Sequence, residues 1–138
     1  MNKTCILTFI FLLCASSLAF SQTVDVSERV MYQLDLYYEL NEYLDGVFRE
    51  FSQGYLEPDP ALKKIHVITH QYNKAVNPVP QETEKLHELT KQLLSRVENY
   101  FIQYKNNFRE DPELNRKIME TRYQLSKEAE RLQYTYGY

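Results

Sequence analysis

The five prolines of this chain fall in three short intervals, and their placement constrains the fold more than any other feature. Pro58 and Pro60 form the first interval, Pro78 and Pro80 form the second, and Pro112 stands alone in the third. A proline in a helix interior removes a hydrogen bond and costs about 3 kcal/mol. The intervals are therefore expected to connect helices that fill the long stretches between them.

Apolar residues in those stretches recur every three or four positions, which is typical of amphipathic helices. The pattern predicts four helices, over about residues 27–53, 60–76, 82–109 and 112–133. We expect Ser27 to cap the first helix, and an Asp-Pro pair to open the second at Asp59 and the fourth at Asp111. Each pair follows a helix that carries Phe-Arg-Glu, at residues 48–50 and 108–110. Because this match is short, we interpret it as shared capping chemistry rather than as an internal duplication.

The apolar stripe of the first predicted helix is broad. It contains Val30, Leu34, Tyr37, Asn41, Leu44, Phe48 and Phe51, widened by Leu36, Leu40, Tyr43 and Val47. A two-stranded coiled coil uses a narrow seam, whereas a bundle helix uses a wider face. The sequence thus predicts an all-α, up-and-down four-helix bundle of two antiparallel hairpins, with residues 22–138 as one domain. The alternative is an extended hairpin array that completes its core by dimerising. Gly46 is either tolerated within its helix or marks a close helix approach.

The first 21 residues have the three parts of a secretion signal. Lys3 supplies the basic start, residues 5–13 form an apolar run, and Ala19 and Ser21 occupy the −3 and −1 positions of a cleavage site. We predict cleavage between Ser21 and Gln22, which makes the protein an exported one.

Two alternative interpretations of this segment, a membrane anchor and a lipid-modified cysteine, have less support in the sequence. A membrane anchor needs about 20 apolar residues, and serines interrupt this run too early. Acylation of Cys14 would require a small residue before it, and Leu13 stands there. Cleavage removes both cysteines, and no N-x-S/T acceptor follows residue 21. Small domains secreted by eukaryotic cells are often rich in disulfides, so we expect a bacterial periplasmic or secreted protein.

The charge of the chain excludes several partners. After loss of Lys3, 15 basic residues face 19 acidic ones, so the net charge is about −4. The two signs are mixed and no basic run occurs. Nucleic-acid binding and attachment to anionic membranes both use clustered basic residues, so neither is expected, and no membrane-spanning segment is expected after cleavage.

His66 and His70 are the most specific candidates for a metal site, because side chains four apart share one helix face. His87 or a glutamate on the third predicted helix, residues 82–109, would have to supply a third ligand. Residues 84–87 give Glu-x-x-His once, whereas di-iron bundles use it twice. Non-covalent haem would need Met31 or Met119 together with a histidine. We expect ordinary surface or boundary histidines, with no metal and no cofactor.

No G-x-S-x-G, P-loop or G-x-G-x-x-G motif is present, so we expect no catalytic site. We predict a non-enzymatic protein with a structural role, or one that binds a protein partner or a second copy of itself. The alternative is a bundle that binds a small ligand or a metal. An enzyme is the third possibility.

The twelve tyrosines allow two interpretations. Tyr37, Tyr72, Tyr100 and Tyr104 lie on the apolar stripes and are expected to fill the core, with hydroxyls at its rim. Others lie at stripe edges, where they suit either packing or a contact surface, namely Tyr32, Tyr38, Tyr43, Tyr55 and Tyr123. The alternating aromatics of residues 134–138 fit a strand better than a helix. We expect a frayed end with its rings on the bundle, and docking of a partner by this tail is the alternative.

Overall fold

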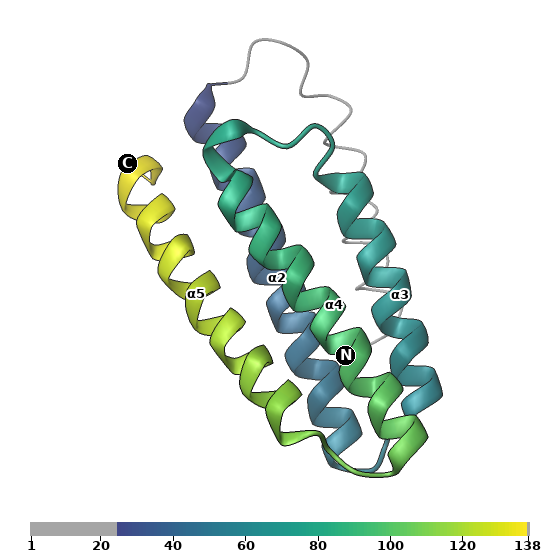
Figure 1. Cartoon of the computed structure of the whole chain (residues 1–138). Coiled ribbons are helices and arrows are strands. Elements are labelled where there is room, and N and C mark those ends of the chain that lie inside the picture. Colours follow the sequence, from purple (N-terminus) through teal and green to yellow (C-terminus); the bar gives the residue numbers. More distant parts are fainter. Residues whose placement is uncertain (1–24, 138) are drawn as a thin grey trace.

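The structure is a computed structural model, and it describes residues 25–137. Within this part of the chain there are four long helices and one short 3-10 turn. They are α2 (Val26–Ser52), α3 (Pro58–Ala75), η1 (Gln81–Thr83), α4 (Glu84–Asn107) and α5 (Pro112–Tyr136). Figure 1 shows the helices side by side with alternating directions. The prediction of an all-helical bundle is confirmed for the described residues, and the segment 1–21 lies outside them.

The four helices close into a ring in chain order. Neighbours in the sequence pack together, and α5 returns to contact α2. The α2–α3 and α4–α5 connections lie at the lower end of Figure 1, and the α3–α4 connection lies at the upper end. We call the lower end the loop end. The chain thus forms a bundle with its own core, not the extended hairpin array.

The start of α3 differs from the expected one, because Pro58 and Pro60 both lie in its first turn. The second helix begins at Pro58 rather than Pro60, so Asp59 lies inside the helix and caps nothing. A missing N–H is harmless in the first turn, because those groups have no partner within the helix. Asp59 instead pairs with Lys105 at the end of α4, with 2.7 Å between Oδ1 and Nζ. The Asp59 cap prediction is therefore wrong.

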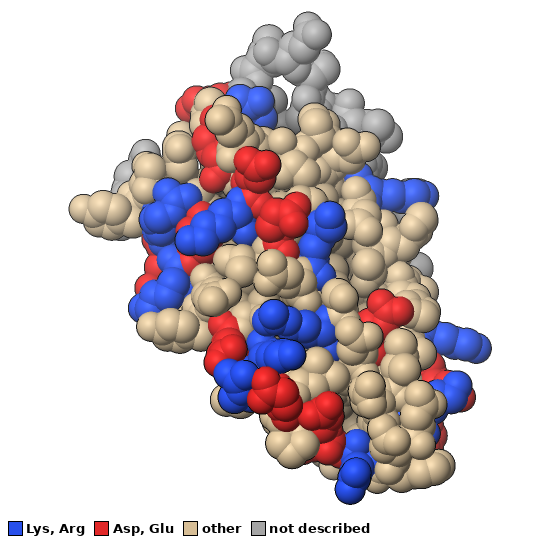
Figure 2. Space-filling model, in the orientation of Figure 1, with Lys and Arg blue, Asp and Glu red and all other residues tan. Residues whose placement is uncertain are grey.

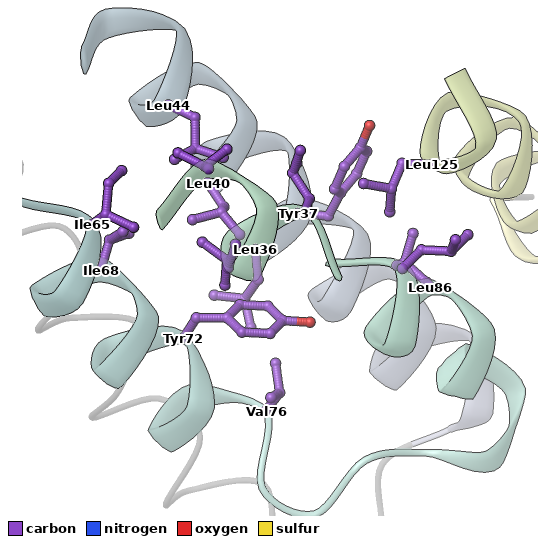
Figure 3. Packing of buried hydrophobic residues seen from close by; sticks show 14 of the residues in the cluster. Leu36, Tyr37, Leu40, Leu44, Ile65, Ile68, Tyr72, Val76, Leu86 and Leu125 are labelled. Atoms are coloured by element: carbon purple, nitrogen blue, oxygen red, sulfur yellow. The ribbon is translucent and has the colours of Figure 1, made fainter. Parts of the chain in front are cut away.

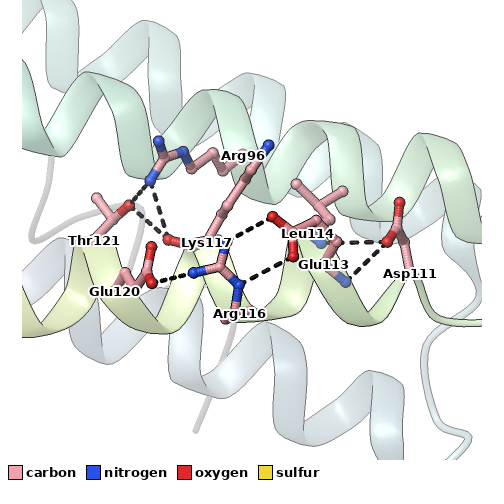
Figure 4. A network of polar contacts seen from close by, with 8 residues as sticks. All are labelled: Arg96, Asp111, Glu113, Leu114, Arg116, Lys117, Glu120 and Thr121. Atoms are coloured by element: carbon pink, nitrogen blue, oxygen red, sulfur yellow. Dashed lines mark hydrogen bonds and ion pairs between the residues drawn. The ribbon is translucent and has the colours of Figure 1, made fainter.

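The other two predicted caps have opposite outcomes. Asp111 is a true cap, because its Oδ1 accepts hydrogen bonds from the backbone N–H groups of Glu113 and Leu114 (Figure 4). Ser27 is not, since α2 begins one residue earlier at Val26. The helix at Glu82 begins as the η1 turn and becomes α-helical at Glu84.

Apolar side chains from all four helices fill the core. Figure 3 shows leucines of α2 facing isoleucines of α3, with Leu86 of α4 and Leu125 of α5 closing the other side. Burying each such side chain contributes roughly 1.5–3 kcal/mol. Gln33 is a polar exception that the sequence pattern did not reveal. It is buried, and neither of its side-chain polar atoms has a hydrogen-bond partner among residues 25–137.

Side chains also join α5 to its two neighbours. Arg122 lies 2.5 Å from Asp45 of α2 and has its guanidinium over the Phe48 ring. Arg96 of α4 donates to the carbonyl oxygen of Lys117 and to the Thr121 hydroxyl (Figure 4). These contacts fix the rotation of α5 about its axis, because they lie on two different sides of that helix.

Gly46 marks no close approach of another helix. A Cβ atom added there would meet no atom of residues 25–137 within 4 Å, apart from its own helix backbone and chain neighbours. The glycine is thus only tolerated within α2. Gly54, in the turn after α2, has φ +78°, a backbone conformation that favours glycine.

Candidate functional site

The two histidines of α3 do not form a metal site. Both are exposed, and His66 is paired with Glu98 of α4, with 2.9 Å between Nε2 and Oε1. Among residues 25–137, no group of three or more His, Cys, Asp or Glu side chains could hold a metal ion.

His87 occupies a different place, half-buried between α3 and α4. Its Nδ1 lies 3.1 Å from the hydroxyl of Tyr72, and the two rings stack. Burial lowers the pKa of His87, and the nearby charge of Lys91 lowers it further. Burial has the opposite effect on the pKa of the Tyr72 hydroxyl, which it raises to about 12. At neutral pH, this pair is therefore an uncharged hydrogen bond that joins two helices.

The remaining candidate ligands are dispersed. Glu84 is exposed at the first position of α4, one turn before His87. Met31 packs against the core of α2, whereas Met119 is exposed on α5. The three histidines belong to α3 and α4.

The tyrosines divide as the two interpretations suggested. Tyr37, Tyr72 and Tyr100 are buried, and Tyr104, Tyr32 and Tyr43 are partly buried. Three of the stripe-edge tyrosines are exposed, namely Tyr38, Tyr55 and Tyr123. Core filling therefore accounts for the first set, and the exposed set remains available for contacts with a partner.

The C-terminal tyrosines are helical, so the expectation of a strand or a frayed end is wrong for the described part of the tail. Helix α5 continues to Tyr136, and the hydroxyl of Thr135 donates to the carbonyl oxygen of Arg131. Tyr136 packs against the core, whereas Tyr134 is 84% exposed. Core contact of Tyr136 extends the helix past the end that periodicity predicted. Tyr138 lies outside the described residues.

The feature that sequence reasoning missed is a cluster of aromatic rings at the loop end. The Phe51 ring lies edge-on to Phe101 at 5.1 Å and to Tyr104 at 4.8 Å between centroids. The Phe48 ring stacks on Phe101 and meets Tyr100 edge-on. These rings come from the last turns of α2 and α4, which the bundle brings together at one end.

An open pocket of about 570 Å³ lies against this cluster. Four aromatic side chains and four polar ones line it: Phe48, Phe51, Tyr100, Tyr104, Arg49, Ser52, Arg109 and Glu110. The last two belong to the connection between α4 and α5, which passes close to the end of α2 in Figure 1. We call this the loop-end pocket. Its volume is within the range of small-ligand sites.

The carboxylate groups near the pocket are engaged by other residues. Tyr100 donates its hydroxyl hydrogen to Oε1 of Glu110 at 2.7 Å. Burial and the Glu110 carboxylate raise the pKa of Tyr100, so the hydroxyl keeps its proton. Glu50 is paired with Lys64 at 3.2 Å. Neither Arg49 nor Arg109 has a side-chain partner in the described part of the chain.

Phe108 ends α4 in an unusual backbone conformation. Its φ of 54° and ψ of 27° lie in the left-handed region, where glycine is the usual residue. The ring is 85% exposed, so packing within the described chain does not explain why a phenylalanine stands there. Left-handed geometry costs a non-glycine residue about 1–2 kcal/mol. Strain of this kind at an exposed aromatic residue is a pointer to function.

The surface around these features carries mixed charge. Figure 2 shows basic and acidic side chains interspersed on the face that it presents. None of the helices within residues 25–137 is long and apolar enough to cross a membrane.

The repeated Phe-Arg-Glu at 48–50 and 108–110 did not indicate a pocket, because the sequence pattern suggests only shared capping chemistry. In the structure, each copy contributes its arginine to the pocket lining. Comparisons with protein-family models, with curated protein sequences and with solved structures found no match.

Proposed function

We propose that this is an exported, non-enzymatic interaction protein that docks a protein partner on its loop end. The observation that carries the proposal is Phe108, an almost fully exposed ring held in a left-handed backbone conformation. A glycine there would relieve the strain, so the ring is best explained by a contact outside the described chain.

A second exposed aromatic residue supports the same end of the molecule. Tyr55 is 82% exposed in the α2–α3 connection, which shares the loop end with Phe108. Exposed aromatic residues are enriched where proteins meet, because each one buries a large area at small entropic cost. The two rings give a partner two anchors on connections that the bundle holds at one end.

Export is the part of the proposal that rests on the sequence alone. The basic Lys3, the apolar run and the Ala19/Ser21 site support cleavage before Gln22. A helical bundle with no cysteine after residue 21 would have to remain folded outside the cytoplasm by packing alone. Mass spectrometry of the native protein tests this, and a first residue far from Gln22 would contradict it.

The competing docking surface is the end of α5. Tyr134 is exposed to the same degree as Phe108, but it lies at the opposite end of the bundle. This makes it a matched control for the loop end, and it also tests the earlier expectation of docking by the tail.

Site-specific photocrosslinking in the cells that produce the protein decides between the two ends. A benzophenone amino acid would replace Phe108, Tyr55 or Tyr134, one at a time. We expect a discrete crosslinked protein from the first two positions and none from the third. Crosslinks only from Tyr134 would move the interface to the tail, and crosslinks from none of the three would refute docking by exposed aromatic residues.

Small-ligand binding is the second candidate function, and the loop-end pocket is the observation that favours it. It lies apart from the candidate metal ligands His66 and His70, and Tyr100 and Tyr104 contribute to its lining.

A further inference from the structure

We propose that the loop-end pocket binds a small aromatic carboxylate, with the ring against the aromatic wall and the carboxylate between Arg49 and Arg109. This inference goes beyond docking of a protein partner, because it concerns the pocket rather than the exposed rings of Phe108 and Tyr55. The ligand class follows from the charge of the pocket and from the chemistry of its wall.

The charge of the pocket favours an anion. Arg49 and Arg109 both line it, and neither guanidinium has a partner within residues 25–137. In an arginine-carboxylate pair, two parallel hydrogen bonds are possible, and such bonds are about twice as strong as uncharged ones. Of the two Phe-Arg-Glu glutamates, Glu50 is paired with Lys64 outside the pocket, whereas Glu110 stays in the lining and accepts a hydrogen bond from Tyr100.

Among the described residues that line the pocket, Glu110 is the single negatively charged one. The Tyr100 hydroxyl holds Glu110 by a 2.7 Å hydrogen bond. That bond orients the carboxylate but does not remove its charge. Glu110 must therefore weaken the binding of any anion, and neutralising it must strengthen that binding.

The aromatic wall selects the rest of the ligand. Phe48, Phe51, Tyr100 and Tyr104 all contribute to the lining, and their rings already meet one another edge-on or stacked. A further flat ring can extend this arrangement, which is favoured over face-to-face sandwiches. The volume of about 570 Å³ accommodates one ring with a short acidic substituent.

The test is a pair of probes that differ in one charge. N-acetylphenylalanine carries the carboxylate, and N-acetylphenylalaninamide has the same ring and a neutral amide. Both would be titrated into the purified protein and followed by two-dimensional NMR. We expect the acid to bind with a Kd on the order of 1 mM. The amide should bind about tenfold or more weakly, because it has no negative charge and offers the guanidinium groups one acceptor oxygen instead of two.

Substitutions of the lining residues test where the acid binds, because each one is expected to change the affinity in a stated direction. Arg49→Gln and Arg109→Gln should each weaken binding of the acid about tenfold. Arg29→Gln is the matched control, because it removes the same charge from the same helix at the end opposite the pocket. Glu110→Gln should strengthen binding severalfold while it keeps an acceptor for Tyr100, and a purely structural role of Glu110 would not give that sign.

Several results would overturn the proposal. These are equal binding of acid and amide, loss of binding with Arg29→Gln, or weaker binding with Glu110→Gln. A doubly capped peptide with adjacent Phe and Asp is included as a third probe, and tighter binding of that peptide would assign the pocket to a protein segment instead. Failure here leaves the crosslinks at Phe108 unaffected, so the two proposals can fail separately.

Discussion

The two glycines of α2 and its following turn offer a controlled measurement of what backbone conformation contributes to this fold. A Cβ atom added at Gly46 or at Gly54 would meet nothing within 4 Å, so neither substitution by alanine causes a clash or gains packing. The two sites differ in their backbone. Gly46 is in the interior of a 27-residue helix, whereas Gly54 has φ +78°.

The magnitudes follow from that difference. Alanine is favoured over glycine in a helix interior by about 0.8–1.0 kcal/mol, and nothing at Gly46 reduces this gain. Gly46→Ala should therefore stabilise the protein by about 1 kcal/mol and raise Tm by about 4 °C. At Gly54 the left-handed conformation costs alanine about 1–2 kcal/mol, and the lower entropy of the unfolded chain returns about 0.4–1 kcal/mol. Gly54→Ala should destabilise by about 0.5–1 kcal/mol.

Urea unfolding followed by circular dichroism measures both changes, with the urea dependence expected to remain unchanged. If Gly46→Ala lowers stability, a neighbour approaches α2 more closely than the structure shows. If both substitutions stabilise, the turn at Gly54 does not hold its left-handed conformation.

Three further predictions concern the core and its buried polar groups. Phe101→Ala should cost about 3–5 kcal/mol in urea unfolding, because the ring is fully buried among other aromatic rings. His87→Gln should make the stability less sensitive to acid. The pKa of His87 is lowered in the folded state, so its protonation favours the unfolded chain. The stability of the native protein is therefore present above the unfolded pKa near 6.5 and is lost as the pH falls below that value. Glu128 is buried with Arg131 and Lys85 around its carboxylate, and hydrogen bonding to Arg131 lowers its pKa, so Glu128→Gln should flatten the Tm profile below about pH 4.5.

Much of the fold could be predicted from the sequence because its signals are local. Prolines interrupt helices within one turn, and apolar periodicity is carried by residues three or four apart. Helix ends are harder to predict where residues distant in the sequence determine them. Asp59 has the sequence position of a cap, but pairing with Lys105 and the second proline at 58 place it inside α3.

The candidate site could not be predicted, because its parts meet only after folding. Phe48 and Tyr100 lie on separate helices, and their spacing in the sequence indicates ordinary core positions. Arg109 and Glu110 reach the pocket through the α4–α5 connection, whose course is set by where α5 packs. The spacing of His66 and His70 on α3 is a local pattern that suggests a metal site, but within residues 25–137 no other helix supplies the further ligand that such a site needs.

The order of the helices determines where the molecule can be attached to a surface or a tag without covering the loop end. The first turn of α2 and the last turn of α5 both lie at the end opposite the loop-end pocket. Anything joined to the chain before Asp25 or after Gly137 therefore begins about one helix length away from Arg49 and Arg109. Because a helix rises 1.5 Å per residue, α4 alone separates the two ends by roughly 35 Å. An affinity handle or a surface linkage joined directly to Asp25 or Gly137 would therefore leave the loop end facing away from the attachment point.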